Sequence, residues 1–522
     1  MFLAGRTNRS ARFKKMALRR FFLDYAVVLI LAAPSYAQEY WPTHGWRFST
    51  PEAQGLESGV LADALDFIHE KHIPIHSLLI ERNGSIVLDA YFFPFSDNQL
   101  HDLASVTKSV TATLVGIAIG EKKLSGVNEP VLPLFPAEAS RNTDPRKAAM
   151  KIEDLLSMRS GLDCDFDQGE LTLAQMQQSP HWIHFMLGLQ MVSQPGNTFV
   201  YCSGGMHVLS GVVTKATGKS ELDYARAELF SPLGIKTTKW PADADGISHG
   251  WGDLHLQPRD MAKLGYLWLH NGDWDGRQIV PADYLSAATA VHSRAPWNDQ
   301  YGYGFWVYPN RTPPIYEGNG RGGQRITVIP SKNMVVVFTG GGFEPGDVGK
   351  FIGAAMKSGQ PLPENRPAVA RLKDSVKRAA RAPSPQPVQP PPALAAKISG
   401  KIFEFDQNPL GLKELSLTFK PGAEASLRLS FIDRRFTAEP VSVRPIGLDG
   451  VPRLSPHGRF DLPIGLKGYW KDDETYVFDY DEIANIDNYQ FELKFGEKGV
   501  FIKLGEKTGT VQLSLAGKLK PY

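Results

Sequence analysis

A proline-rich segment divides the chain into two parts with different residue patterns. Six of the ten residues from Pro383 to Pro392 are proline, which favours a semi-rigid, extended spacer. Helical and strand patterns alternate upstream of this segment, whereas a period of two dominates downstream of it. At 522 residues the chain also exceeds what one hydrophobic core usually organises. We therefore predict two folded domains, at residues 38–355 and 397–522, joined by a Pro-rich linker at 356–396.

The upstream part has paired strand patterns at both of its ends. Two apolar segments, 77–80 and 85–88, flank the turn Asn83-Gly84, which is typical of a β-hairpin. A second pair, 325–330 and 334–339, lies at the other end. Helical patterns lie between these pairs. The order predicts an α/β (α+β) domain whose antiparallel sheet is flanked by helices and combines the two ends of the domain.

The downstream part consists of short alternating segments separated by glycine-containing turns. The clearest examples are 415–419, 427–431, 476–480, 491–495 and 511–515. Such a pattern predicts an antiparallel all-β barrel or sandwich. Because no convergent set of titratable residues stands out in it, we predict an accessory domain. We also expect residues 38–360 to fold alone and keep the functional site.

Residues 1–37 have the features of a secretory signal peptide. Seven basic side chains precede the apolar run 26–33, and Ser35-Tyr36-Ala37 supplies small residues for cleavage. The run is too short to span a bilayer comfortably. Without this leader the chain has 50 basic and 54 acidic side chains, a net charge of −4. We predict a secreted or periplasmic protein with no membrane span after the signal is removed.

The composition argues against several other classes of function. A formal charge of +2 gives no indication of nucleic-acid binding, and two cysteines cannot form a four-thiolate zinc site. The segment His69-Glu70-Lys71-His72 lacks the spacing of zinc peptidases, and no phosphate-binding glycine-rich loop is present. We therefore predict neither a metal nor an organic cofactor. The sequence gives no indication of the oligomeric state.

The strongest catalytic signal is Ser105-Val106-Thr107-Lys108 at the start of an apolar helical run. Ser105 and Lys108, three residues apart, face the same way at a helix N-terminus, for which Asp102 is a candidate cap. Backbone N–H groups at such an end stabilise a developing oxyanion. The lysine supplies a proton acceptor or a positive charge beside a hydroxyl that is otherwise a poor nucleophile. Considered alone, the pair also fits a capped helix with an exposed lysine.

A second signal is Tyr201-Cys202-Ser203, which precedes two glycines. A tyrosine beside the serine and lysine can act as a phenolate base or a proton relay. The small polar Ser203 can hydrogen-bond the substrate or the lysine. Considered alone, Tyr201 also fits an aromatic residue packed in a turn.

Taken together, these motifs resemble the serine β-lactamase-like family, whose signature is Ser-x-x-Lys, then Ser-x-Asn or Tyr-x-Asn, then Lys-Thr-Gly. Tyr201-Cys202-Ser203 and Gly322-Gly323-Gln324 are most similar to the 6-aminohexanoate-dimer hydrolase branch, which cleaves linear amides. The resemblance covers about residues 48–345. It implies a β-lactamase-like fold, with Ser105, Lys108 and Tyr201 as the catalytic residues. Further segments of family-like sequence are Lys151–Leu162, Pro232–Ile235 and Pro258–Gly265.

Two motifs depart from the family pattern. Ser203 stands where penicillin-active relatives have Asn, and the only Lys-Thr-Gly, at Lys507-Thr508-Gly509, lies in the C-terminal part and is typical of a hairpin turn. The better positional match to the third motif is 315–320. A glycine-rich edge strand there lets a substrate approach the backbone, and an amide at Gly318 or Asn319 could be the second oxyanion donor.

The missing lysine of the third motif leaves recognition of a β-lactam carboxylate without its usual cation. Arg321 or Arg325 could compensate, although a surface or packing role is the simpler interpretation of both.

The resemblance also suggests that the two cysteines lie close together. Cys202 follows Tyr201, and Cys164 follows the turn Ser160-Gly161-Leu162, which approaches the same cleft in resembling proteins. Since export delivers both to an oxidising compartment, we predict a disulfide between them. Two buried free thiols are the alternative.

The sequence therefore predicts an exported serine hydrolase that cleaves an amide or ester through an acyl-serine intermediate. Its substrate is a small-molecule or peptide-like amide or ester. The sequence does not decide whether Lys108 or Tyr201 is the general base. The alternatives are a non-catalytic binding or sensor protein with the penicillin-recognising fold, or a true β-lactamase or DD-peptidase.

Overall fold

The structure is a computed structural model that describes residues 40–164, 170–432, 439–507, 509 and 511–521. Pro42–Tyr522 forms one compact unit. The signal peptide predicted at residues 1–37 lies outside the described residues and stays a prediction. Within the described ranges, no helix combines the length and the apolar character needed to cross a membrane.

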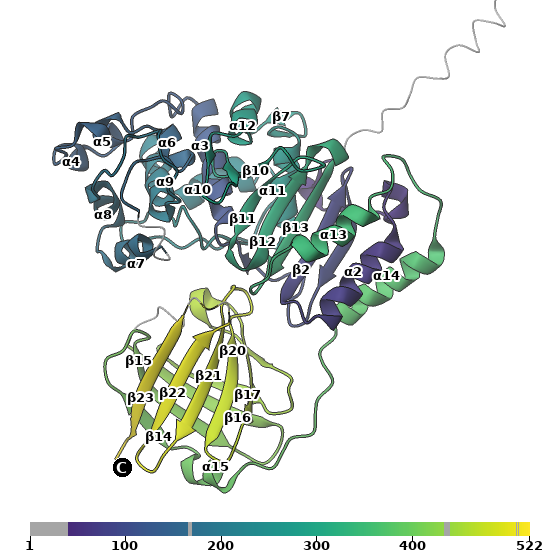
Figure 1. The fold of residues 1–522 in the computed structure, drawn as a ribbon, viewed down its shortest axis with the longest axis vertical. Helices are drawn as coiled ribbons and strands as arrows, with labels where there is room; N and C mark the ends of the chain where they lie inside the picture. Colours follow the sequence, from purple (N-terminus) through teal and green to yellow (C-terminus); the bar gives the residue numbers. More distant parts are fainter. Residues whose placement is uncertain (1–39, 165–169, 433–438, 508, 510, 522) are drawn as a thin grey trace, which may run out of the picture. The chain divides into compact units, whose positions relative to one another are not determined.

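A nine-stranded sheet is the framework of the region upstream of the proline-rich segment (Figure 1). Its strand order is β1-β3-β2-β13-β12-β11-β10-β9-β8, and β1 pairs parallel to β3 while the other neighbours pair antiparallel. This sheet with flanking helices confirms the predicted fold class. The strands are β1 (Arg47–Phe48), β2 (Ile75–Arg82), β3 (Ser85–Tyr91), β8 (Ser293–Arg294), β9 (Gln300–Tyr301), β10 (Trp306–Tyr308), β11 (Ile315–Gly320), β12 (Gln324–Ile329) and β13 (Met334–Gly340).

Two hairpins from opposite ends of this region meet in the centre of the sheet. The β2–β3 turn places Asn83 and Gly84 at positive φ, 52° and 76°, as a tight two-residue hairpin requires. The β12–β13 turn uses Asn333 at φ 46°. Strand β13 then pairs with β2, with Val336 opposite Ile80. The pairing confirms that the sheet combines the two ends of the region.

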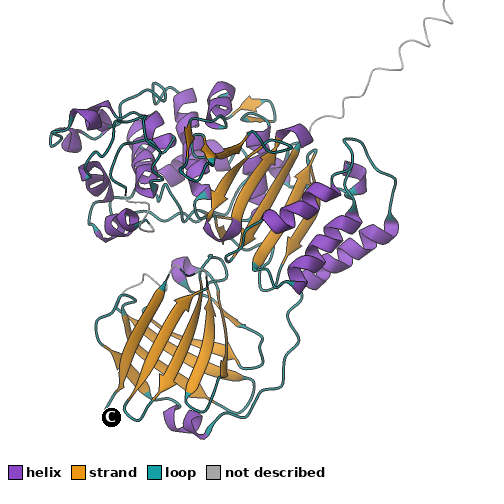
Figure 2. Ribbon diagram, viewed as in Figure 1, coloured by secondary structure: helices purple, strands orange, loops and turns teal. Residues whose placement is uncertain are grey.

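Helices cover both faces of the sheet (Figure 2). Val336 and Phe338 of β13 belong to an apolar cluster with α2 (Ser58–Glu70) and α13 (Gly346–Ala355). On the other face, α11 (Pro258–Leu269) lies so close that a Cβ at Gly265 would be 2.5 Å from Val335 Cγ1. Since successive strand residues face opposite sides, this double cover explains why β13 is apolar almost throughout.

The remaining helices of this region lie mainly between β4 (His101–Asp102) and β8. The longest, α3 and α9, pack against each other, and the predicted site residues Ser105, Lys108 and Tyr201 lie at or just before their first turns. The helices between β4 and β8, apart from α11, are α3 (Val106–Gly120), α4 (Pro136–Ala139), α5 (Pro145–Ala149), α6 (Ile152–Leu156), α7 (Leu171–Gln178), α8 (Trp182–Gly188), α9 (Ser203–Thr217), α10 (Glu221–Ala225) and α12 (Ala282–Ala288).

A helix, α14 (Arg366–Ala379), lies within the segment predicted to be the linker. It packs along α2, and Figure 1 shows the two helices side by side. Leu372 joins the apolar cluster, while Arg371 and Arg378 each lie 2.7 Å from a carboxylate oxygen of Asp66. The packed region therefore extends beyond residue 355, and within the predicted linker the stretches without helix or strand are 357–365 and 380–392.

The C-terminal region is a closed barrel rather than a sandwich. Nine of its described strands form a ring that a β17–β19 pairing closes, and β18 attaches to β19. Fully buried side chains, among them Tyr476, Phe478 and Leu493, fill the interior. The strands are β14 (Ile402–Phe405), β15 (Leu412–Phe419), β16 (Glu424–Phe431), β17 (Val441–Gly447), β18 (Arg453–Ser455), β19 (Ile464–Trp470), β20 (Thr475–Asp481), β21 (Asn488–Phe495), β22 (Gly499–Glu506) and β23 (Gln512–Leu519).

The packing of α14 can be tested with Leu372→Ala. Leu372 is 5% exposed, so truncating its side chain to alanine removes buried apolar area and leaves a cavity. We expect the free energy of unfolding to fall by about 2–4 kcal/mol in urea titrations. The exposed Lys373, its neighbour on α14, provides a control in Lys373→Ala, which should change it by less than about 0.5 kcal/mol. Equal stability of the two variants would show that α14 does not pack as described.

Candidate active site

Ser105 lies at the junction between β4 and α3. It is the residue before the first helical position of α3, so its backbone N–H lies outside the helical hydrogen-bond ladder. Ala104 has φ 45°, an uncommon conformation for a residue with a side chain. Asp102 Oδ1 accepts the Ala104 N–H at 2.8 Å. Asp102 therefore restrains the turn before Ser105 instead of capping the first turn of α3.

Lys108 lies one helical turn after Ser105 and points toward it. Its Nζ is 2.7 Å from Ser105 Oγ and donates to the Trp251 carbonyl oxygen at 3.0 Å. The side chain is 1% exposed. Burial lowers the pKa of Lys108 to about 8, although the charges of Glu170 and Asp253 act in the opposite direction. A lysine with this pKa can take a proton from a neighbouring hydroxyl near neutral pH.

Tyr201 is close to both Lys108 and Ser105. Lys108 Nζ is 4.8 Å from the centre of the Tyr201 ring, which also stacks on Trp306. Burial raises the pKa of Tyr201 well above its usual value and Glu170 adds to this effect, while a hydrogen bond with Ser105 acts against both. The structure therefore brings Ser105, Lys108 and Tyr201 together. The phenol is neutral at ordinary pH and can pass a proton on.

Glu170 is a member of the site that the sequence analysis missed. Its carboxylate accepts a hydrogen bond from Ser203 Oγ, so Ser203 contacts this acid rather than the lysine. Glu170 also lines the same pocket as Ser105 and Tyr201. No motif marks this residue, because its position depends on how the start of α7 packs against α9.

The end of β11 lies against Ser105. A Cβ at Gly320 would be 3.1 Å from the Ser105 backbone N and 2.6 Å from the Leu103 carbonyl oxygen. Only glycine permits this approach. Gly318 instead lies against α3, where a Cβ would be 3.0 Å from Ser109 Oγ. Asn319 lies between these two glycines and lines the pocket.

Strand β11 is paired with β12 on one side and with β10 on the other, so it is not an edge strand along its whole length. The pairing with β10 ends at Glu317. The segment 318–320 therefore has one side without a strand partner, and the predicted open edge is limited to this end of β11.

The pocket at this site has a volume of about 830 Å³. Trp297, Trp306 and Tyr308 give it aromatic walls. Arg321 also lines it, with a side chain that is 42% exposed. Arg325 is buried, and its guanidinium donates to the Gly320 carbonyl oxygen at 2.9 Å. Of the two arginines, Arg325 therefore supports β11, and Arg321 is the more accessible cation.

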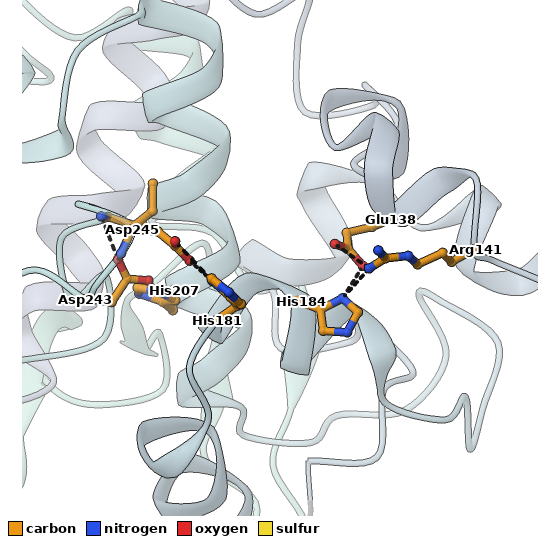
Figure 3. Close-up of polar contacts among 8 residues, drawn as sticks. Glu138, Arg141, His181, His184, His207, Asp243 and Asp245 are labelled. Carbon is orange, nitrogen blue, oxygen red and sulfur yellow. Dashed lines mark hydrogen bonds and ion pairs between the residues drawn. The ribbon is translucent and has the colours of Figure 1, made fainter.

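The Trp251 carbonyl oxygen, which accepts a hydrogen bond from Lys108 Nζ, belongs to a loop that is anchored on α9. His207 of α9 is fully buried and lies 3.0 Å from Asp243, whose other oxygen accepts the backbone N–H of Asp245 (Figure 3). This loop continues to Trp251. Contacts remote from the pocket therefore fix the carbonyl oxygen that holds the amine of Lys108.

The structure joins Cys164 and Cys202 in a disulfide, with Cα atoms 5.5 Å apart. Cys202 lies directly between Tyr201 and Ser203. The bond therefore ties the segment that carries Tyr201 to a second segment of the site.

Within the described ranges, no group of three or more His, Cys, Asp or Glu side chains is arranged to hold a metal ion.

Comparisons with known proteins place this chain in a family. The family model for Beta-lactamase matches residues 55–356. The chain is 23% identical to 6-aminohexanoate-dimer hydrolase of Paenarthrobacter ureafaciens, over 50% of this chain and 71% of that protein. It is 23% identical to penicillin-binding protein 4* of Bacillus subtilis, over 48% and 63%. The octameric penicillin-binding protein homologue from Pyrococcus abyssi is similar in structure, with a TM-score of 0.45, 17% identity, and coverage of 88% and 99%.

The chain belongs to the beta-lactamase family. This confirms the resemblance drawn from its motifs. The family includes hydrolases such as 6-aminohexanoate-dimer hydrolase.

The disulfide predicts two measurable properties. Peptide mapping of the unreduced protein should recover Cys164 and Cys202 in one cross-linked fragment. The double variant Cys164→Ser/Cys202→Ser should lose about 4 kcal/mol of unfolding free energy, because the bond closes a loop of 38 residues in the unfolded chain. Two alkylatable thiols in the unfolded, unreduced protein would contradict the prediction.

Proposed function

We propose that this protein is an exported serine hydrolase that cleaves an amide or ester through an acyl-serine intermediate. The observation that carries the proposal is the 2.7 Å contact between Ser105 Oγ and the buried amine of Lys108, inside a pocket also lined by Tyr201. A serine hydroxyl is a weak nucleophile until a neighbouring base removes its proton. The buried lysine is placed to do so.

The pKa values favour Lys108 as the base in the first step. With a pKa of about 8, a fraction on the order of one tenth of the amine is neutral at pH 7. The phenol of Tyr201 has a raised pKa, so its phenolate is scarce at that pH. In this proposal Ser105 attacks the carbonyl carbon as its proton moves to Lys108. Tyr201 then relays a proton to the leaving amine or alcohol.

Backbone amides complete the proposed mechanism. The Ser105 N–H lies outside the helical ladder of α3, and the end of β11 approaches it closely at Gly320. Donors at these two places would stabilise the charge on the tetrahedral oxyanion. Water then attacks the acyl-serine, with the same amine and phenol moving its protons, and restores Ser105.

The pocket supports a small-molecule or peptide-like substrate. Its volume of about 830 Å³ and its aromatic walls suit an elongated acyl or amine group with apolar parts. The similarity to 6-aminohexanoate-dimer hydrolase favours a linear amide as one of the substrates to test. The leader-like residues 1–37 and the disulfide support export to an oxidising compartment.

A panel of reagents tests the reaction class. The protein is incubated with a fluorophosphonate, a labelled penicillin, and sets of esters and linear amides, and any adduct is located by mass spectrometry. We expect a fluorophosphonate adduct on Ser105 and turnover of an ester or an amide. Stable penicillin labelling with no turnover would favour a penicillin-binding or sensor role. No adduct with any reagent would contradict the hydrolase.

The nucleophile is tested by Ser105→Ala. Labelling and turnover should disappear, because no other hydroxyl in the proposal attacks the carbonyl. The free energy of unfolding should change by no more than about 1 kcal/mol, since one partly exposed hydroxyl is lost and Val106 and Val110 still pack the helix. A folded variant with full activity on its best substrate would refute the mechanism.

The role of Lys108 is tested by the pH dependence of fluorophosphonate labelling. The rate should rise with pH up to about 8 and level off above it, because the base acts only when neutral. Glu170→Gln keeps a hydrogen-bond acceptor for Ser203 but removes a negative charge that raises the pKa of Lys108. The inflection should therefore move to lower pH in this variant. An inflection that stays in place, or moves upward, would contradict the assignment.

Glu344→Gln is the matched control for this experiment. Its side chain is 89% exposed, and its carboxylate is not among the charges that raise the pKa of Lys108. The inflection in this variant should stay at the wild-type pH.

A further inference from the structure

One loop of the C-terminal barrel contacts the residues that surround Ser105. It comprises residues Glu482–Asp487 between β20 and β21, and we call it the β20–β21 loop. Its Ile483, Ala484 and Ile486 are buried. A turn at the end of a barrel usually faces water, so the burial of three apolar side chains indicates that this one is packed.

The loop contacts the chain directly ahead of the nucleophile. The Ala484 carbonyl oxygen accepts the backbone N–H of Asp102 at 2.7 Å. The Asp102 side chain in turn accepts a hydrogen bond from the Ala104 backbone N–H. Ala104 has a positive φ, which sets the direction in which the chain enters Ser105. A residue in this conformation keeps it only where its surroundings restrain it. The barrel supplies one of these restraints.

The loop also contacts the chain beside the nucleophile. Asp487 forms an ion pair with Arg321, the residue after Gly320, which lies against the Ser105 backbone N. Ile486 packs on the next residue, Gly322: a Cβ added to Gly322 would lie 2.3 Å from Ile486 Cγ2. Gly322 has φ 81°, so the turn itself needs a glycine. Asp487 and Ile486 together hold the backbone that leaves the end of β11.

A third set of contacts fixes the loop to β5 (His255–Leu256), the partner of β4. Asn485 Oδ1 is 3.0 Å from His255 Nε2, and His255 is paired with Asp102 across the β4–β5 ladder. Arg459, also from the barrel, lies 3.5 Å from Asp487. Burial acts to raise the pKa of Asp253, but a hydrogen bond with His249 and the charge of that residue lower it to about 2, and the charge of Arg459 adds a smaller contribution in the same direction. A network of charged groups thus extends from the barrel to residues close to Lys108.

We propose that the β20–β21 loop is a structural component of the active site, in which Asp487 is a positioning residue that acts through Arg321. The proposal rests on the proposed function and extends it. The loop restrains both backbone segments that meet at Ser105, at 102–104 and at 320–322. Catalytic groups need this restraint, because a displacement of about 1 Å can reduce a rate on the order of 100-fold. The barrel is then required for hydrolysis rather than being only an accessory.

The experiment uses the full-length protein and the rate constant for fluorophosphonate labelling of Ser105. Asp487→Asn keeps the shape of the side chain and removes its charge. Asp406→Asn is the matched control, because this barrel carboxylate is 89% exposed and pairs only at the surface, 3.4 Å from Lys518. The wild-type adduct on Ser105 is measured first. Its absence would refute the proposed function, which separates that failure from a failure of the present proposal.

We expect Asp487→Asn to label about 10- to 100-fold more slowly than the wild type at an unchanged far-ultraviolet circular dichroism spectrum. Asp406→Asn should label at the wild-type rate. The double variant Arg321→Gln/Asp487→Asn should be no slower than Arg321→Gln alone, because Asp487 acts through that arginine. Asp487→Glu, which keeps the charge, should recover part of the rate.

Two results would overturn the proposal. One is a folded Asp487→Asn protein that labels at the wild-type rate. The other is a double variant whose loss is the product of the two single losses, because the two residues would then act independently. If Asp487→Asn does not fold, Asn485→Ala takes its place, since it removes the contact with His255 and leaves the ion pair intact. Its expected result is the same slow labelling in a folded protein, and wild-type labelling would again refute the role of the loop.

Discussion

The contact between the amine of Lys108 and the hydroxyl of Ser105 is the interaction that the rest of the site serves. Removal of this amine from water disfavours its charged form and lowers the pKa of Lys108 to about 8, although the charges of Glu170 and Asp253 act in the opposite direction. The structure offsets this with two hydrogen-bond partners for Nζ, Ser105 Oγ and the Trp251 carbonyl oxygen. Each partner needs its own support. Asp102 restrains the turn into the serine, and the pairing of His207 with Asp243 anchors the loop that ends in Trp251.

This requirement explains why the site draws on segments that are far apart in the chain. Ser105 and Lys108 lie at the start of one helix, Tyr201 lies just before another, and the glycines belong to a strand more than 200 residues away. The large sheet makes the arrangement possible, because the pairing of β13 with β2 brings the two ends of the region together. The close approach of Gly320 to Ser105 then depends on the register between β11 and β12.

Signals within a few residues of one another could be predicted from the sequence. The Asn83-Gly84 turn, the alternation of the barrel strands, and the three-residue spacing of Ser105 and Lys108 all act through local geometry. Glu170 could not be predicted, because an acid in a polar segment acquires a role only when the chain folds back onto Ser203. The packing of α14 was also missed. Its basic, alanine-rich sequence resembles an exposed helix, and Leu372 gives little indication of the cluster that it enters.

The position of α14 has a practical consequence for dividing this protein into fragments. A truncation before residue 366 would remove the helix that covers one side of α2 and would leave the Asp66 carboxylate without Arg371 and Arg378. Newly exposed apolar surface of this kind promotes aggregation. A fragment ending at residue 360, which the sequence led us to expect to fold alone, would expose this surface for reasons unrelated to the barrel. Its insolubility would be easy to misread as a need for the second domain. A fragment that ends after α14, near residue 382, separates these two causes.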